Sequence, residues 1–422
     1  MTTAHPERLR RRDLLRWLAA SFGVGAVRAA LANAGAEDLP PVRAITRGPK
    51  HHWFGYYDKL EFDPSGRYVL GMEVDFEHRS PRPDDLIKVG MIDLQDGDRW
   101  IELGESRAWC WQQGCMLQWL PGSKTEVLWN ERQGDRFVCV VLDVVSRSRR
   151  TLPAPIYALS PDARWAVAPD FRRLHDTRPG YGYAGIPDPN RDRAAPEDAG
   201  IWRIDLATGR SDLLISFREV AAIPYLKQGE ADGAKHWINH LLVAPDGSRI
   251  SFLHRWKAPT RKSFTTRLIT MDPDGKGLYV LDPYGKTSHY IWRDPRHILA
   301  WAWHPSLGEK FYLYEDRTDR VEAVAPEVMT ENGHCTYLPG NRWILNDTYP
   351  DRRREQHPYL YDTVRGTKHP LGHFRSPPEY TGEWRCDTHP RFSPDGRNVV
   401  IDSPHGGEGR QLYLIDISGI VG

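Results

Sequence analysis

The sequence predicts an all-β protein that folds as a single seven-bladed β-propeller. Two observations lead to this fold class: one strand–turn–strand unit recurs along the chain, and helical periodicity is scarce between its copies. The clearest copy starts at His389 and reads HPRFSPDGRNVVIDS, a short apolar strand, a Pro-Asp-Gly turn and a returning strand. Proline presets such a turn and glycine tolerates positive φ, so the segment is typical of a β-hairpin.

Three further copies carry a histidine in the same register. They are HLLVAPDGSRISF from His240, HCTYLPGNRWIL from His334 and the looser HYIWRDPRHILAW from His289. In the copies from His240, His334 and His389 the histidine stands five residues before a proline. His289 stands at the equivalent strand start. This shared register is the main indication of function.

Seven copies fill residues 37–422, which we expect to form one domain. They begin near Lys59, Met116, Ile156, His240, His289, His334 and His389. Spacings of about 40 to 57 residues, with one of 84, are typical of four-stranded propeller blades. Only three strands remain after His389, so the fourth strand of the last blade is predicted at Val42–Thr46. Joining both ends of the chain in one blade removes the open sheet edges.

Residues 1–36 are predicted to be a twin-arginine-type signal peptide. Arg10-Arg11-Arg12-Asp13-Leu14-Leu15 precedes an Ala-rich apolar segment, and Ala34-Gly35-Ala36 resembles a cleavage site. The alternative is a membrane anchor, but only eleven uncharged residues separate Arg16 from Arg28. That is too short to span a bilayer. We therefore expect a periplasmic or secreted protein without a membrane span.

Charge and motifs exclude several function classes. The net charge is +1 with 27% charged residues, so no basic face for nucleic acid is expected. The sequence contains no GxSxG elbow, P-loop or HExxH motif, which leaves serine hydrolase, nucleotide-binding and zincin functions unsupported. We expect a monomer or a small homo-oligomer.

One long insertion separates two strands of the third copy, at residues 170–200. It is polar, and long ordered loops in compact domains are often functional. Its candidate substrate-binding residues could hold an anionic sugar by charge and stacking; they are Arg172, Arg173, His175 and Arg178, with Tyr181 and Tyr183. The alternative is a solvated loop with surface arginines. The segment HHWFGYYDK at residues 51–59 is either an aromatic wall beside the channel or a strand packed in the core.

The four repeat histidines are expected to face the axial channel. They begin the innermost strands of four consecutive blades, so they converge on one side of the channel mouth. Clustered imidazoles are suited to binding a divalent metal or to proton transfer. A single histidine of this kind more often hydrogen-bonds a turn aspartate. Four in register beside Asp387 favour a functional site.

The last four blades resemble the oligogalacturonate lyase family of seven-bladed propellers, which degrade pectin. The resemblance is carried by HLLVAPDGSRISFLH from His240, HYIW from His289, His334 before NDTY, and DTHPRFSPDG near the end. It implies a metal held by blade-start histidines and cleavage of an acidic sugar chain by β-elimination. By position His289 and His389 match metal ligands of the family, and His334 lies in the same register.

Two departures separate this chain from that family. Its further ligands, a glutamine and a histidine, fall at Trp384 and Asp387 here; an aspartate can ligate a metal and a tryptophan cannot. The sequence also reads FLHRW where family members usually have an acidic residue after the histidine. The family's substrate is therefore not transferred to this chain.

The sequence thus predicts a lyase that cleaves a uronic-acid-containing oligo- or polysaccharide by metal-assisted β-elimination. The predicted metal ligands are His289, His334, Asp387 and His389. Predicted bases are His240 and His254, with Arg255 as a carboxylate clamp and Arg385 as a further substrate-binding residue. Imidazoles with one carboxylate suit Mn or Zn, whereas Ca prefers more oxygen ligands. The alternative functions are a purely structural metal, or a non-catalytic propeller that binds a glycan or a protein partner.

Overall fold

The computed structural model describes residues 37–227 and 229–422. The predicted signal peptide, residues 1–36, lies outside this range. The chain divides into a unit Met1–Leu39 and a unit Pro40–Gly422, and the second is described below. Within the described residues, no helix has the length and apolar composition needed to cross a membrane.

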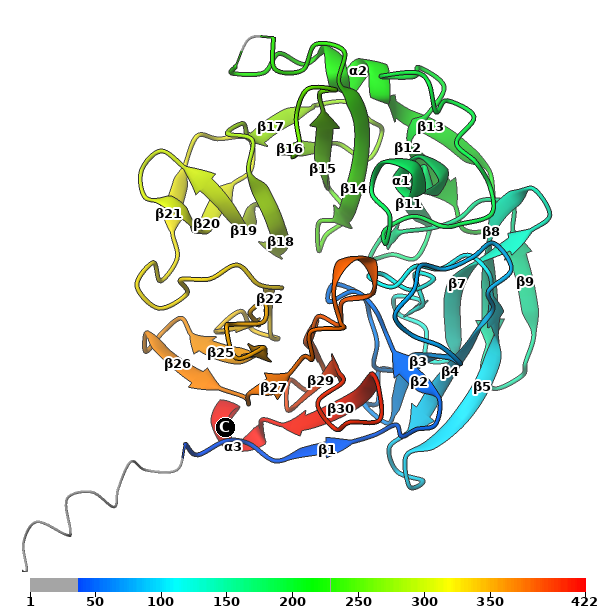
Figure 1. Ribbon diagram of the computed structural model, residues 1–422, viewed down its shortest axis with the longest axis vertical. Helices are drawn as coiled ribbons and strands as arrows, with labels where there is room; N and C mark the ends of the chain where they lie inside the picture. Colours follow the sequence, from blue (N-terminus) through cyan, green and yellow to red (C-terminus); the bar gives the residue numbers. More distant parts are fainter. Residues whose placement is uncertain (1–36, 228) are drawn as a thin grey trace, which may run out of the picture. The chain divides into compact units, whose positions relative to one another are not determined.

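Seven four-stranded antiparallel sheets follow one another around a common axis (Figure 1). The first contains β2 (His51–Trp53), β3 (Tyr68–Val74), β4 (Ile87–Asp93) and β5 (Arg99–Ser106). The second contains β6 (Gln118–Trp119), β7 (Glu126–Gln133), β8 (Arg136–Asp143) and β9 (Arg149–Leu152). The third contains β10 (Ala158–Leu159), β11 (Trp165–Pro169), β12 (Gly200–Asp205) and β13 (Ser211–Ser216). The fourth contains β14 (Lys235–Val243), β15 (Ile250–Lys257), β16 (Thr265–Met271) and β17 (Tyr279–Asp282).

The remaining sheets complete the ring. The fifth contains β18 (Thr287–Asp294), β19 (His297–His304), β20 (Gly308–Glu315) and β21 (Val321–Ala323). The sixth contains β22 (Thr336–Tyr337), β23 (Trp343–Asn346), β25 (Tyr359–Asp362) and β26 (Thr367–Pro370). The seventh joins β28 (Arg391–Phe392), β29 (Asn398–Ser403) and β30 (Gln411–Asp416) to β1 (Val42–Ala44). The predicted all-β, seven-bladed architecture is confirmed.

Few elements lie outside the blades. Helix α1 (Phe171–Thr177) opens the segment between β11 and β12, and the Asp170 side chain accepts hydrogen bonds from its first N–H groups. Helix α2 (Phe217–Ala222) starts with a capping box, in which Ser216 and Glu219 satisfy each other's backbone N–H groups. The others are α3 (Ser418–Val421), a 3₁₀ turn at Gly382–Trp384, and the pair β24 (Glu355–Gln356) with β27 (Phe374–Arg375).

The ring closes where the sequence predicts. Val42 pairs with Ile415, and Ala44 with Tyr413. The strand itself ends at Ala44, but Ile45 N–H donates to the Leu412 carbonyl. Leu412 N–H in turn donates to Oγ1 of Thr46. The paired stretch therefore reaches Thr46.

A buried ionic network reinforces the seam between the first and last blades. The guanidinium of Arg391 donates to Glu61 in the first blade (Nε–Oε2 2.9 Å) and to Asp402 in the last (Nη2–Oδ1 2.7 Å). Burial raises the pKa of Glu61 to about 7, even though Arg391 lowers it. The carboxylate's charge thus depends on Arg391, and removing the arginine would leave two acidic groups buried beside each other.

The first blade starts earlier than its repeat suggested. The repeat begins near Lys59, but β2 covers His51–Trp53, and Phe62 forms only an isolated bridge to Val69. Both β2 and Phe62 pair with β3, and the Glu61 carbonyl accepts from Leu70 N–H, so residues 54–60 leave the sheet between two points of contact. This excursion is the part of the fold that completes the candidate site.

Removing residues 37–48 is expected to destabilise the whole domain, because it deletes β1 and leaves β30 as an open edge. Thermal unfolding followed by circular dichroism should show a lower midpoint and a broader transition. Removing only residues 37–40, which precede the paired strand, is the control and should leave the midpoint unchanged. An unchanged, equally cooperative transition in the longer deletion would contradict closure through β1.

Candidate functional site

Residues 54–59 enter the axial region as a tight loop. Asp402 accepts the backbone N–H groups of Phe54 and Gly55, each at 3.3 Å. Gly55 has φ 111°, and a Cβ there would lie 2.8 Å from the backbone of Gln113, so no other residue fits without a shift. The loop is thereby held so that Tyr56 and Tyr57 contact the repeat histidines.

The two tyrosines are buried among the four histidines. The ring centroid of Tyr56 lies 5.0 Å from that of His240 and 5.2 Å from that of His389. Tyr57 lies 5.3 Å from His334 and 6.0 Å from His289. The hydroxyl of Tyr57 donates to the Tyr290 carbonyl at 3.0 Å, which fixes its ring. The predicted convergence of the four histidines is therefore present, with an aromatic pair between them.

The histidines reach the axis through irregular backbone. His240 lies within β14 at a register shift between Asn239 and Leu242, and its φ is 51°. His289 lies in β18 at a second shift, and His389 has φ 39° before β28. Positive φ is strained for a residue with a Cβ, and a bulge turns a side chain away from the regular pleat. The bulges and the strained backbone thus direct these side chains toward the axis.

Asp347 orients the imidazole of His334 and binds the backbone of His389. Its Oδ1 accepts the backbone N–H of His334 at 2.7 Å and lies 2.9 Å from Nδ1 of the same residue. Its Oδ2 accepts the Thr388 hydroxyl at 2.6 Å and the His389 N–H at 3.2 Å. A carboxylate can only accept, so Nδ1 of His334 carries the proton and Nε2 keeps its lone pair.

His289 is oriented in a similar way. Its Nδ1 lies 3.1 Å from Oδ1 of Asn332, an amide oxygen that accepts a hydrogen bond from Nδ1–H. Its Nε2 lies 3.5 Å from the Tyr349 hydroxyl. The ring centroid is 4.1 Å from that of His334. Fixing Nδ1–H through an oxygen acceptor is the usual support of a metal-binding imidazole.

The donor atoms converge on one point. Nε2 of His334 and Nε2 of His389 are 3.1 Å apart, and Oδ2 of Asp387 lies 3.9 Å from Nε2 of His389. Donor atoms of these three residues all lie within 4.8 Å of one another. Burial is the main cause that holds the pKa of His289 and of His389 well below its usual range. Neutral imidazoles offer lone pairs, so this donor set fits a divalent cation.

Beside this cluster lies a His–Asp–Lys group. Oδ2 of Asp58 is 3.3 Å from Nε2 of His240, and Oδ1 is 3.1 Å from Nζ of Lys59. Burial would raise the pKa of Asp58, but Lys59 and His240 outweigh it and bring the pKa below its ordinary value. The carboxylate is therefore ionised and lies within ion-pair distance of Nε2 of His240. Nδ1 of His240 is buried and has no partner among the residues described.

Arg385 links the cluster to the insertion. Its Nε donates to Oδ2 of Asp387 at 2.7 Å, and its Nη2 donates to the Tyr181 hydroxyl at 2.6 Å. Burial would raise the pKa of Tyr181, but the guanidinium groups of Arg385 and Arg178 outweigh it and hold the pKa below its usual range. Tyr181 also packs with Tyr56 and Tyr57. Of the insertion residues predicted to bind substrate, Tyr181 is the one in contact with the axial cluster.

With this geometry established, comparison with solved structures shows which fold it belongs to. An oligogalacturonate lyase in complex with manganese is 16% identical over 90% of this chain and 93% of its own, with a TM-score of 0.64. An oligogalacturonate lyase from Vibrio parahaemolyticus is 13% identical over 89% of this chain and 93% of its own, with a TM-score of 0.63. This chain has the fold of these lyases. No family model and no curated protein matches the sequence.

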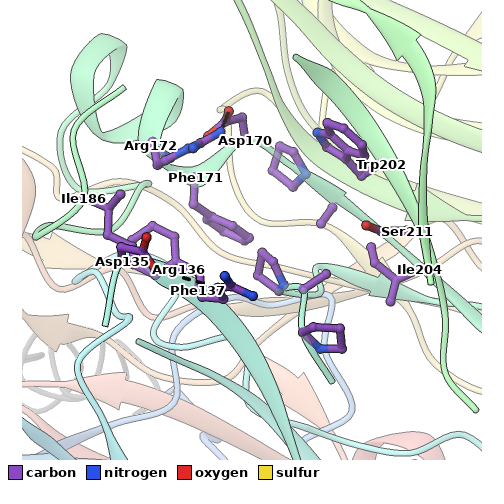
Figure 2. Close-up of a pocket in the computed structure, with 15 residues that line it drawn as sticks. Asp135, Arg136, Phe137, Asp170, Phe171, Arg172, Ile186, Trp202, Ile204 and Ser211 are labelled. Carbon is purple, nitrogen blue, oxygen red and sulfur yellow. Dashed lines mark hydrogen bonds and ion pairs between the residues drawn. The ribbon is translucent and has the colours of Figure 1, made fainter. Parts of the chain in front are cut away.

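Three predicted substrate-binding residues lie elsewhere in the insertion. Arg172 forms a salt bridge with Asp170 at 2.7 Å. It lines an outer groove of about 690 Å³ together with Phe137, Trp202 and Ile204 (Figure 2). Arg173 is fully buried and donates to Asp188 and to four backbone carbonyls, which gives it a packing role. His175 contacts another cavity, lined also by Asp176 and Arg191.

His254 and Arg255 lie on opposite faces of β15. His254 pairs across the sheet with Ile238, and Arg255 with Trp237. Nδ1 of His254 accepts from Nε of Arg267 at 3.1 Å, and its Nε2 lies 2.9 Å from His236. Within the described residues, the hydrogen bonds of His254 link it to Arg267 and His236 and not to the axial histidines. Adjacent residues of a strand alternate between faces, so His254 and Arg255 cannot serve the same site directly.

Several residues at the site carried no role in the sequence analysis. They are Tyr57, Asp58, Lys59, Asn332, Asp347 and Tyr349. The segment HHWFGYYDK combines the two alternatives, a strand packed in the core and an aromatic wall beside the channel: Trp53 packs in the core, and Tyr56–Lys59 line the axis. The role of Asp347 could have been predicted. Asp347 directly follows a strand of the blade that starts at His334, and a blade-start histidine often hydrogen-bonds an aspartate in a turn.

Purified protein is expected to contain a stoichiometric divalent metal, and His389→Ala should lose it because Nε2 of His389 faces both His334 and Asp387. Elemental analysis of the native protein and the variant measures this. His357→Ala is the matched control: it removes an imidazole from a separate, partly exposed Asp351–Glu355–His357 group and should retain the metal at the axis. Native protein without metal, or equal loss in both variants, would contradict the assignment to the axial site.

Proposed function

We propose that this chain is a lyase that cleaves a uronic-acid-containing oligo- or polysaccharide by metal-assisted β-elimination. The observation that carries the proposal is the pairing of two buried units: three oriented imidazoles with Asp387, and a His240–Asp58 pair beside them. The first unit fits a cation and the second fits a base. The likeness in fold to oligogalacturonate lyases, one of them in complex with manganese, supports the same class.

The chemistry requires removal of an acidic proton next to a carboxylate. β-Elimination takes the C5 proton of the uronic acid, forms the C4=C5 double bond and breaks the bond from C4 to the glycosidic oxygen. Negative charge develops on the substrate carboxylate as the proton leaves. A divalent cation at His289, His334, His389 and Asp387 would neutralise that charge, and Mn or Zn suits this donor set better than Ca.

His240 is the proposed base. The ionised Asp58 carboxylate lies 3.3 Å from its Nε2 and favours the proton there, so the unpartnered Nδ1 would have the lone pair that can accept the C5 proton. Lys59 keeps Asp58 ionised. Arg385, whose guanidinium lies between Asp387 and Tyr181, is proposed to orient the substrate carboxylate.

We also propose that the protein acts outside the cytoplasm, following the twin-arginine-type sequence at residues 1–36. The substrate would then be an acidic glycan met in the periplasm or the medium. The rival function is a non-catalytic propeller that binds a glycan or a protein, in which the histidines only brace the loops at the axis. Asp347 favours that rival most, because its carboxylate receives backbone N–H groups from two blades.

Incubation with pectic, glucuronan-like and ulvan-like oligosaccharides is expected to produce an unsaturated sugar, seen as ultraviolet absorbance of the C4=C5 bond. His240→Ala should reduce the rate about 10²- to 10⁴-fold, the usual contribution of a general base, with melting temperature as the folding control. His254→Ala, which removes an imidazole that contacts Arg267 and His236, should keep the rate. Retained binding without product across the panel would instead favour the non-catalytic propeller.

The pH dependence tests the base. Burial is the main cause that lowers the pKa of His240, and the Asp58 carboxylate opposes this by raising it. The base must be neutral, so kcat/KM should fall only as pH drops through a pKa below about 6.5. Asp58→Asn removes the raising contribution, so the acid limb should move to still lower pH and the plateau rate should fall. A limb that stays in place or moves upward would contradict the His240–Asp58 pairing.

A further inference from the structure

Buried N–H groups without partners gather beside the candidate site. Nε and Nη1 of Arg255, Nη1 of Arg178 and Nε1 of Trp237 are all buried and have no hydrogen-bond partner within residues 37–227 and 229–422. Buried polar groups are almost always paired, and an unpaired guanidinium N–H is especially costly. Four such donors in one place indicate that an acceptor belongs there.

One exposed phenylalanine holds these donors together. The guanidinium carbons of Arg178 and Arg255 lie 5.0 and 4.9 Å from the ring centroid of Phe264, and the Trp237 ring lies 5.6 Å from it. Trp237 and Arg255 are directly opposite each other on β14 and β15, so they share one face of the fourth blade. Phe264 is 41% exposed. The donors thus lie under an aromatic side chain at the surface.

The charge in this place is positive and uncompensated. Among the residues that the structure describes, neither Arg178 nor Arg255 has a carboxylate within ion-pair distance, unlike Arg172, Arg173 and Arg385. Two guanidinium groups on one ring repel each other unless an anion lies between them. The arrangement therefore selects an anionic acceptor over a neutral one.

The group of donors continues into the candidate site. The guanidinium carbon of Arg178 lies 4.1 Å from the ring centroid of Tyr181, whose hydroxyl accepts from Arg385, the partner of Asp387. Asn239, two residues from Trp237 on β14 and next to His240, has a buried amide oxygen without a partner. An acceptor of that kind fits a sugar hydroxyl.

We propose that Arg178, Arg255 and Trp237 form a second anion-binding subsite, which takes the carboxylate or sulfate ester of the sugar next to the one that reacts. This inference rests on the proposed function. It adds a substrate requirement: at least two neighbouring sugars, each with an anionic group. Carboxylate and sulfate oxygens share the chemistry that guanidinium forks recognise.

Isothermal titration calorimetry in the His240→Ala background, in which turnover is slowed, tests the subsite. The probes are digalacturonate, its methyl diester, and a disaccharide of a uronate with a sulfated sugar. Arg178→Met and Arg255→Met should each weaken the preferred anionic disaccharide about tenfold or more, the usual effect of losing a hydrogen bond to a charged group. Binding of the neutral diester should not weaken. If the Met variants weaken binding of digalacturonate more than binding of the sulfated disaccharide, the subsite takes a carboxylate; the reverse result identifies a sulfate ester.

The matched control is Arg203→Met, since Arg203 also stacks on an aromatic ring, 4.8 Å from Trp165, but in the third blade. Arg255→Lys, which keeps the charge, should bind between the native and Met forms and guards against misfolding. Unchanged affinity in both Met variants, equal loss for the neutral diester, or no binding of any anionic probe would overturn the subsite. If these affinity losses occur but protein with His240 intact forms no elimination product, the subsite stands and the lyase proposal fails. If that protein forms product and the Met variants bind normally, the lyase proposal stands and the subsite fails.

Discussion

The carboxylate of Asp347 is the contact on which the candidate site depends. It is fully buried and binds groups from two neighbouring blades: the N–H and Nδ1 of His334, and the N–H of His389 with the Thr388 hydroxyl. A buried carboxylate costs much unless it is fully hydrogen-bonded, and here the bonds that stabilise it also fix one imidazole tautomer. The stability of the loops and the orientation of the donor atoms therefore depend on the same hydrogen bonds.

A second constraint is that regular strands cannot place side chains on the axis. The histidines and the Tyr56–Lys59 loop reach it through bulges, positive φ and an excursion from the first sheet. Such backbone is unfavourable locally and persists because the surrounding blades over-determine it. Asp402 accepts the N–H groups of the excursion, and Arg391 donates to the carbonyl of His389. The two residues also bind each other in the ionic network that joins the first and last blades.

The repeat made the fold and the histidine register predictable, because each copy carries the same turn chemistry and hydrophobic alternation. Residues outside the repeat were not accessible in this way. Tyr56–Lys59 lie at the axis only because β3 pairs on both sides of them, which no local pattern reveals. Asn332 acts through contacts distant in sequence. The separation of His254 from Arg255 was within reach, since strand alternation alone assigns them to opposite faces. The positions of Arg172 and Arg173 could not be predicted from composition. Each guanidinium is held by nearby carboxylate or carbonyl groups, which the sequence does not identify.

The seam between β1 and β30 also sets the order of events during folding. The strands of six blades lie between β1 and the last blade in the sequence, so β1 and β30 cannot pair until those blades have been synthesised. Contacts so distant in sequence form slowly. During that interval the edge of β30 is open to other molecules, including further copies of this chain. The time between synthesis and ring closure is therefore when the protein is most exposed to misassembly.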